Sequence, residues 1–123
     1  MSFFSSKVQK DFNYLEMTPR RIHGYEVNES GMIDVLVPKF KNELLKKIFI
    51  PSNKSQYIRA NLDEFGSETW KLIDGENKVS IIADTLNDKF GEKIQPVHQR
   101  LTMFLTNLYR NGFISFIEIE REK

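Results

Sequence analysis

The sequence contains no cysteine, and this absence excludes several kinds of chemistry. A chain without thiols can form no disulfide, no thiolate nucleophile and no cysteine-ligated zinc or iron–sulfur site. Long apolar runs are also missing, since no stretch approaches the ~18 consecutive apolar residues of a membrane helix. The opening residues, Met1 to Lys7, are interrupted by polar side chains too soon for a signal peptide. Together these absences predict a protein of the cytoplasm.

Signs of catalysis are equally scarce. His23 and His98 are the only histidines, and they lie far apart in the sequence, whereas a metal site needs several converging ligands. The six glycines are dispersed, so no phosphate-binding loop is present. The adjacent carboxylates Asp63 and Glu64 precede a helical pattern, where a cap explains them. We therefore expect a protein that is not an enzyme and that holds neither a metal nor a cofactor.

The composition is that of a small globular domain. Hydrophobic residues make up 40% of the 123 residues and include ten Phe and one Trp, which suffices for one core. Apolar residues between Phe3 and Leu15 are spaced as on one helical face, and Thr18-Pro19 ends that pattern. We predict an N-terminal arm or short helix over residues 1–20 and a single domain over 21–123.

The middle of the chain has the period of β-strands. Tyr25–Val27 and Ile33–Val37 flank Asn28–Gly31, which has the composition of a hairpin turn. Lys47–Ile50 is a further candidate strand, and Ser55–Ala60 alternates polar and apolar residues. These segments predict a small antiparallel sheet.

From Asp63 onward the pattern becomes helical. Asp63 is suited to cap a helix that ends near Asp74-Gly75. A second helix is predicted over Val79–Phe90, and a third from Pro96 to Asn111-Gly112. Phe113–Ile119 then alternates as a strand or hairpin arm. The predicted class is α+β, with a small antiparallel N-terminal β-sheet joined to a three-helix winged helix-turn-helix.

A spaced series of residues runs through this helical half. Its members are Leu62-Asp63, Gly66, Trp70, Leu72, Asp74-Gly75, Val79, Ile82-Ala83, Leu86, Phe90-Gly91, Phe104-Leu105, Leu108 and Gly112-Phe113-Ile114. With these spacings, the stretch from Leu62 to Phe116 resembles the PqqD-like family, named after protein D of pyrroloquinoline quinone synthesis. Two features depart from the family pattern. Lys78 stands where a capping Thr or Ser is usual, so Asn77 or Ser80 is expected to cap, and the segment between Val37 and Tyr57 is long enough to cover part of the sheet edge.

The resemblance implies a non-catalytic peptide chaperone, also called a recognition element for ribosomally made, modified peptides. Such proteins hold the leader of a precursor peptide while a partner enzyme, often a radical SAM enzyme, modifies the remainder. The peptide is expected to add a strand to the sheet edge beside the third helix. The residues predicted to contact it are Tyr57, Ile58 and Arg59 on the last strand, with Leu101, Leu105 and Tyr109 as an apolar floor.

Other interpretations remain open at this point. The same six residues could simply pack the sheet on the helix. A winged helix could bind DNA, but its third helix carries only Arg100 and Arg110, and residues 61–123 hold eight Lys/Arg against eleven Asp/Glu. A homodimeric scaffold could pair through the same sheet edge. The basic bias between Lys39 and Arg59 indicates either a solvated face or a surface for an acidic partner.

Overall fold

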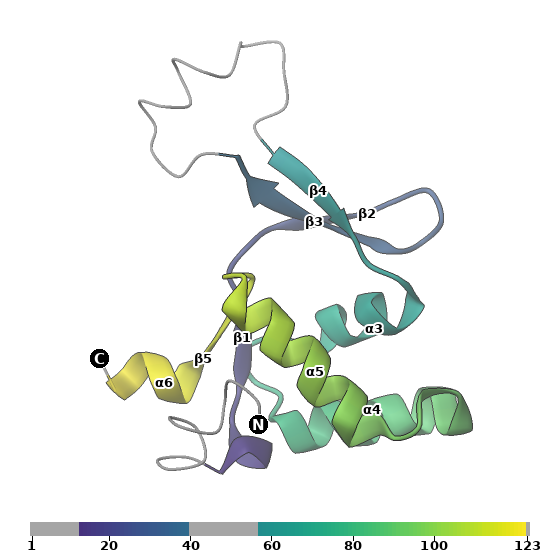
Figure 1. The fold of residues 1–123 in the computed structure, drawn as a ribbon, viewed down its shortest axis with the longest axis vertical. Coiled ribbons are helices and arrows are strands. Elements are labelled where there is room, and N and C mark those ends of the chain that lie inside the picture. The colour runs from purple at the N-terminus through teal and green to yellow at the C-terminus, as the bar shows by residue number, and fades with distance from the viewer. Residues whose placement is uncertain (1–12, 40–56, 123) are drawn as a thin grey trace.

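The computed structural model describes residues 13–39 and 57–122 of the chain. Residues 3–12 of the predicted helical stripe and the candidate strand at Lys47–Ile50 lie outside these residues. The described elements form two small antiparallel sheets and a set of helices, so the α+β class is confirmed (Figure 1). Strands predicted at Tyr25–Val27 and from Ile33 are present as β2 and β3.

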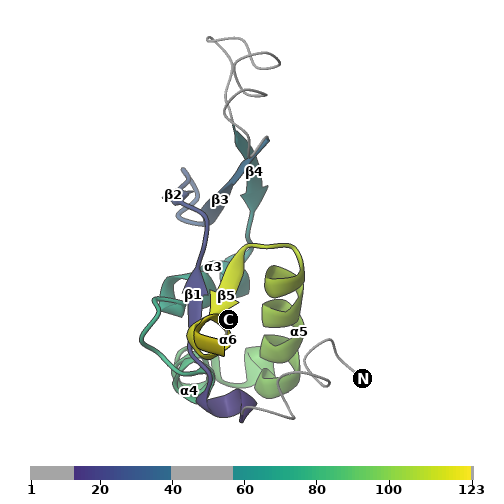
Figure 2. The same cartoon turned by 90° about the vertical axis from the view of Figure 1, so that its left-hand side faces the viewer.

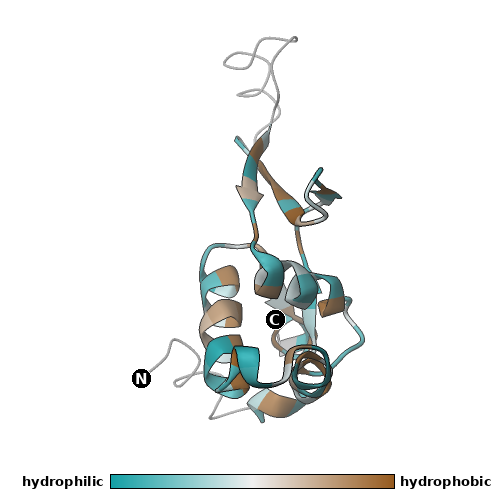
Figure 3. Cartoon of the chain, turned by 90° about the vertical axis from the view of Figure 1, so that its right-hand side faces the viewer, coloured by the Kyte–Doolittle hydropathy of each residue, from teal (hydrophilic) through white to brown (hydrophobic). Residues whose placement is uncertain are grey.

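The larger sheet has the strand order β2-β3-β4. Its strands are β2 (Tyr25–Val27), β3 (Ile33–Pro38) and β4 (Tyr57–Asn61), all antiparallel to their neighbours. The turn between β2 and β3 is stabilised by the Asn28 carboxamide oxygen, which accepts from the backbone N–H groups of Ser30 and Met32. Figure 3 shows hydrophobic and hydrophilic residues alternating along β4, as a strand with two different faces requires.

Three helices follow the sheet. The first is α3 (Glu64–Leu72), and the Asp63 carboxylate caps it by accepting from Gly66 N–H at 2.7 Å. The second is α4 (Val79–Phe90), whose bounds match the prediction, and Gly91 ends it with a φ of 60°. The third is α5 (Val97–Arg110), one residue after Pro96.

The prediction that Asn77 or Ser80 caps α4 with its side chain is wrong. Lys78 occupies the N-cap position and no side chain caps the helix. The Asn77 carboxamide instead donates to Leu72 C=O at 3.1 Å, so this side chain closes the end of α3. The turn between the two helices therefore uses Asn77 to satisfy the first helix rather than the second.

A second, two-stranded sheet joins the ends of the described chain. It pairs β1 (Pro19–Arg21) with β5 (Ile114–Phe116) in antiparallel register, and short 3-10 helices η1 (Tyr14–Glu16) and η2 (Gly91–Ile94) precede β1 and α5. The prediction of a strand through Ile119 is wrong, because α6 (Ile117–Glu122) begins directly after β5. Ile117 N–H still donates to Thr18 C=O at 2.9 Å, but Thr18 N–H donates to the Glu118 side chain and not to Ile117 C=O, so the ladder ends there.

Glu118 holds helix α6 against the residue that precedes β1. Its carboxylate accepts from Thr18 N–H at 2.8 Å and from Thr18 Oγ1 at 2.9 Å. Ile119, the next residue, is buried in the core. The helical turn thus satisfies the backbone donor ahead of β1 and buries an apolar side chain at the same place.

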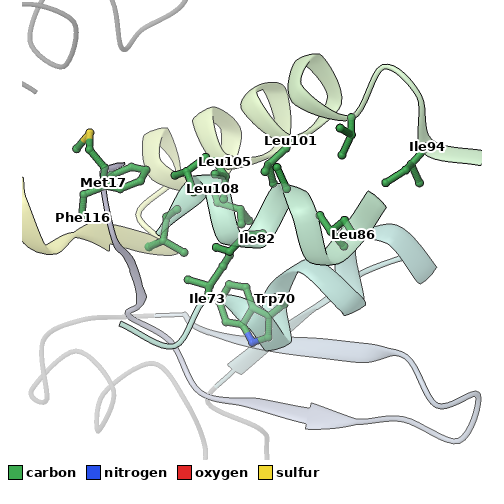
Figure 4. Close-up of a cluster of buried hydrophobic side chains, with 14 of the residues drawn as sticks. Met17, Trp70, Ile73, Ile82, Leu86, Ile94, Leu101, Leu105, Leu108 and Phe116 are labelled. Carbon is green, nitrogen blue, oxygen red and sulfur yellow. The ribbon is translucent and has the colours of Figure 1, made fainter. Parts of the chain in front are cut away.

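The core lies between the three helices and the inner face of both sheets. Trp70 is fully buried, as the sequence predicts, and it sits with Ile73 and Ile82 at the centre of the cluster (Figure 4). From α5, Leu101, Leu105 and Leu108 point into the same cluster. The position of α5 is therefore fixed by leucines on one of its faces.

This burial predicts different costs for two neighbouring residues of α5. Leu105 is 0% exposed and Met103 is 61% exposed. Leu105→Ala should lower the free energy of unfolding by about 2–5 kcal/mol, because it removes buried methyl groups and leaves a cavity. Met103→Ala should change it by no more than about 0.5 kcal/mol. Urea unfolding followed by the fluorescence of Trp70 measures both, and equal costs would contradict the placement of α5.

Candidate functional site

The outer edge of β4 is the first component of the candidate site. Leu62 N–H donates to Ile33 C=O at 2.9 Å, and the register pairs Ala60 with Val35 and Ile58 with Val37. Because the residues of an antiparallel strand alternate between inward and outward hydrogen bonding, the backbone N–H and C=O groups of Arg59 and Asn61 point away from β3. Among the described residues, none forms a backbone hydrogen bond to these outward groups.

Helix α5 lies on the same side of the molecule as this edge. Figure 1 shows α5 running below β4, and Figure 2, turned by 90°, again shows both elements on one side. A pocket of about 460 Å³ opens between the end of β4 and α5. Its lining residues are Asn61, Leu62, Asp63, Phe65, Arg100, Met103 and Phe104. The outward-facing backbone groups at the end of β4 therefore lie beside a mainly apolar pocket.

Two aromatic rings form the apolar part of this pocket. Phe65 of α3 and Phe104 of α5 meet edge to face, with their centroids 5.8 Å apart. Gly66 leaves room for this contact, because a Cβ atom there would lie 3.2 Å from the Phe104 ring. Met103 stands exposed at the rim. The hollow can thus accept a large apolar side chain.

Arg100 supplies the positive charge of the pocket. Its guanidinium lies 4.9 Å from the centroid of the Phe65 ring and donates to Lys93 C=O at 3.1 Å. These two contacts orient the group at the pocket rim.

On the face of the sheet that carries the Arg59 side chain, a polar cluster centres on Asp34. This carboxylate is only 5% exposed and accepts from the carboxamides of Asn28, at 3.0 Å, and Asn61. Arg59 lies 3.4 Å from Asp34 and 2.6 Å from Glu26. The cluster therefore links all three strands and holds two residues of β4 by their side chains.

The hydrogen bonds from Asn28 and Asn61 lower the pKa of Asp34 below its usual value, and the nearby Arg59 charge acts in the same direction. The carboxylate is thus stabilised in its charged form inside the folded sheet.

A comparison with protein-family models decides the family. The model described as "Coenzyme PQQ synthesis protein D (PqqD)" matches residues 50–114, more than half of the 123-residue chain. The chain belongs to the PqqD family. Searches of the curated proteins and of the solved structures found no match. The matched span contains β4, α3, α4 and α5, so the edge and the pocket lie within the PqqD region.

The six residues that the sequence singles out do not form one surface. Tyr57, Ile58 and Arg59 are exposed on β4, and Ile58 is 56% exposed. In contrast, Leu101 and Leu105 are 1% and 0% exposed, because they belong to the face of α5 that packs on the core. They support the pocket from beneath and contribute no surface to it.

Tyr109 lies apart from the pocket beside β4. Its ring contacts Phe116 at a centroid distance of 5.5 Å, and it lines a second hollow with Ile22 and Arg110 at the C-terminal end of α5. The sequence-based choice also left out Phe65, Arg100, Met103 and Phe104. Met103 carried a usable signal, because it is an apolar residue outside the core stripe of α5.

The part of the chain that the structure describes has neither a cluster of metal ligands nor a helix that could span a membrane. Over 13–39 and 57–122, no three His, Asp or Glu side chains group as metal ligands would. No helix of this part of the chain is both long enough and apolar enough to cross a membrane.

The lowered pKa of Asp34 predicts how stability depends on pH. A group whose pKa is depressed by folding stabilises the fold above its unfolded pKa, about 3.9 for Asp, and this contribution is lost as the pH falls through the folded pKa. Asp34→Asn should therefore be less stable than the natural chain at pH 7, and the difference should shrink below pH ~4. Urea unfolding at several pH values tests this, and a difference independent of pH would contradict it.

Proposed function

We propose that this protein is a non-catalytic module that binds the leader of a ribosomally made precursor peptide and presents it to a modifying enzyme. The observation that carries the proposal is the outward-facing backbone of Arg59 and Asn61 beside the pocket of Phe65 and Phe104. An extended peptide can satisfy these N–H and C=O groups by adding a strand to β4. Membership of the PqqD family supports the same role.

The alternation of a bound strand would give two kinds of contact. Every second side chain would point toward α5, where the pocket removes it from water, and the others would point toward the solvent. Burying one side chain of the size of Leu contributes about 1.5–3 kcal/mol, and each backbone hydrogen bond contributes about 0.5–1.5 kcal/mol. A few such contacts, reduced by the cost of ordering the peptide, give reversible binding. Reversibility is what a presenting module requires.

The proposed contacts on β4 are those of Tyr57, Ile58 and Arg59. On α5 the proposed surface contacts are those of Met103 and Phe104, which line the pocket, with Leu101 and Leu105 on the core side of the helix. Tyr109 would be reached only by a peptide that continues along α5. The partner that acts on the bound peptide is proposed to be a radical SAM enzyme of the cytoplasm.

Two further points of the proposal concern alternative roles. We interpret α3, α4 and α5, followed by the β1–β5 pair, as a winged helix-turn-helix in which α5 occupies the position of the DNA-reading helix. Its two arginines, Arg100 and Arg110, are too few for strong phosphate neutralisation. A second copy of the chain could also pair with β4 and would then compete with the peptide.

A pair of variants at Arg59 tests the strand addition. Arg59→Pro removes the outward N–H and leaves the inward bonds of Ile58 and Ala60 in place, while Arg59→Ala removes only the side chain. The probe is a peptide that binds the natural chain, selected from a random library displayed on phage. In calorimetric titrations, Arg59→Pro should bind it roughly tenfold more weakly than Arg59→Ala, because one backbone hydrogen bond is lost and the ring obstructs the edge.

Circular dichroism should show that both variants are folded, since neither change removes an inward hydrogen bond of β4. Equal affinities of the two variants would contradict strand addition at β4. A concentration-dependent dimer that dissociates when peptide is added would place the second copy at the same edge, whereas a dimer unaffected by the peptide would not.

A further inference from the structure

We propose that Arg100 makes the pocket selective for acidic leader peptides, which carry a large apolar side chain and a carboxylate two residues apart. This inference rests on the proposed function, because it concerns the peptide that would lie along β4. The apolar side chain would enter between Phe65, Phe104 and Met103, and the carboxylate would meet the guanidinium of Arg100.

The guanidinium is oriented before any peptide arrives. One of its nitrogen atoms donates to Lys93 C=O at 3.1 Å, and its plane lies near the Phe65 ring at 4.9 Å from the centroid. A guanidinium has five N–H donors, so several remain for a carboxylate. Because the group is already held in place, less side-chain entropy is lost when an anion binds.

The charge of Arg100 is also available. Arg59 is paired with Glu26 and Asp34, and Arg20 is paired with Glu120. Within residues 13–39 and 57–122, no carboxylate lies within ion-pair distance of Arg100. A ligand carboxylate would therefore gain a charge-assisted hydrogen bond without displacing an existing partner.

The pocket also carries a negative charge. Asp63 lines the pocket and is held in place by its bond to Gly66 N–H at 2.7 Å. A peptide carboxylate next to Asp63 would be repelled, whereas one next to Arg100 would be attracted. A bound carboxylate is thus favoured only where it lies nearer to Arg100 than to Asp63.

The spacing of the contacts fixes the pattern of the ligand. Arg100, Met103 and Phe104 are three and four residues apart on α5, so they lie on one face of the helix. Side chains on one face of a strand recur every second residue, at about 7 Å. An apolar residue in the pocket and an acidic residue at Arg100 should therefore be separated by one residue, in either order according to the direction of the bound strand.

A random peptide library tests this pattern without a known ligand. Twelve-residue peptides displayed on phage are selected on the full-length protein, and bound phage are eluted and sequenced. The natural chain should enrich peptides with Asp or Glu two positions from Leu, Ile, Phe or Met. Arg100→Gln should lose the acidic preference, and Arg100→Glu should enrich Lys or Arg at the same position. Arg110→Glu is the matched control, because Arg110 is exposed on the same helix and lines the other hollow.

One selected peptide then gives the affinities. Arg100→Gln should weaken its binding roughly fivefold to tenfold and reduce the dependence of affinity on salt. Replacing the acidic residue of the peptide by Lys should weaken binding to the natural chain and restore part of the affinity to Arg100→Glu. Circular dichroism and urea unfolding serve as controls and should show that the variants are folded.

The outcomes separate this inference from the proposed function. If no enriched peptide binds more weakly to Arg59→Pro than to Arg59→Ala, no peptide adds a strand to β4 and the proposed function itself is wrong. If such peptides are enriched but show no acidic preference, or if Arg110→Glu changes the preference as much as Arg100→Glu does, the selectivity assigned to Arg100 is wrong and the binding edge remains.

Discussion

The ladder of hydrogen bonds between β3 and β4 is the constraint on which the site depends. Its register assigns the inward positions to Ile58 and Ala60, and by alternation it turns the backbone of Arg59 and Asn61 outward. A shift by one residue would reverse this assignment and would also move the apolar residues of β4 to the polar face of the sheet. The same ladder therefore fixes both the outward-facing edge and the side chains that flank it.

Polar contacts on the other face of the sheet secure this register. Asp34 of β3 binds the side chains of Arg59 and Asn61, the two residues whose backbone faces outward. Their side chains are thereby held on the polar face, while their backbone groups face outward. A buried carboxylate with several hydrogen-bond donors is costly to displace, so it favours a single arrangement of the strand. The edge is in this way positioned by residues that a peptide need not touch.

Much of the helical half could be predicted from the sequence. The apolar spacing from Val79 to Phe90 predicted the bounds of α4. Asp63 and Gly91 mark helix ends by capping chemistry that can be recognised in the sequence itself. The errors arose where a distant partner decides the outcome. Ile117–Ile119 alternates like a strand but turns into helix where the Glu118 carboxylate takes the Thr18 N–H that would continue the ladder, and the Asn77 side chain serves α3 rather than α4.

The site was harder to predict for the same reason. Periodicity shows that α5 has an apolar face, but it cannot tell which apolar residues point into the core and which line a hollow. Leu101 and Leu105 proved to be core residues, whereas Met103 and Phe104 reach the pocket. The stacking of Arg100 on Phe65 joins two helices that lie far apart in the sequence, and only the tertiary structure brings them together.

Amide hydrogen exchange along β4 tests the central claim most directly. In the free protein, the amides of Ile58 and Ala60 should exchange slowly because they bond to β3, and those of Arg59 and Asn61 should exchange fast. Addition of a peptide that binds the protein should slow the exchange of the Arg59 and Asn61 amides and leave the exchange of the Ile58 and Ala60 amides unchanged. Slow exchange of Arg59 and Asn61 before any peptide is added would show that the edge is already occupied, and this result would contradict the account.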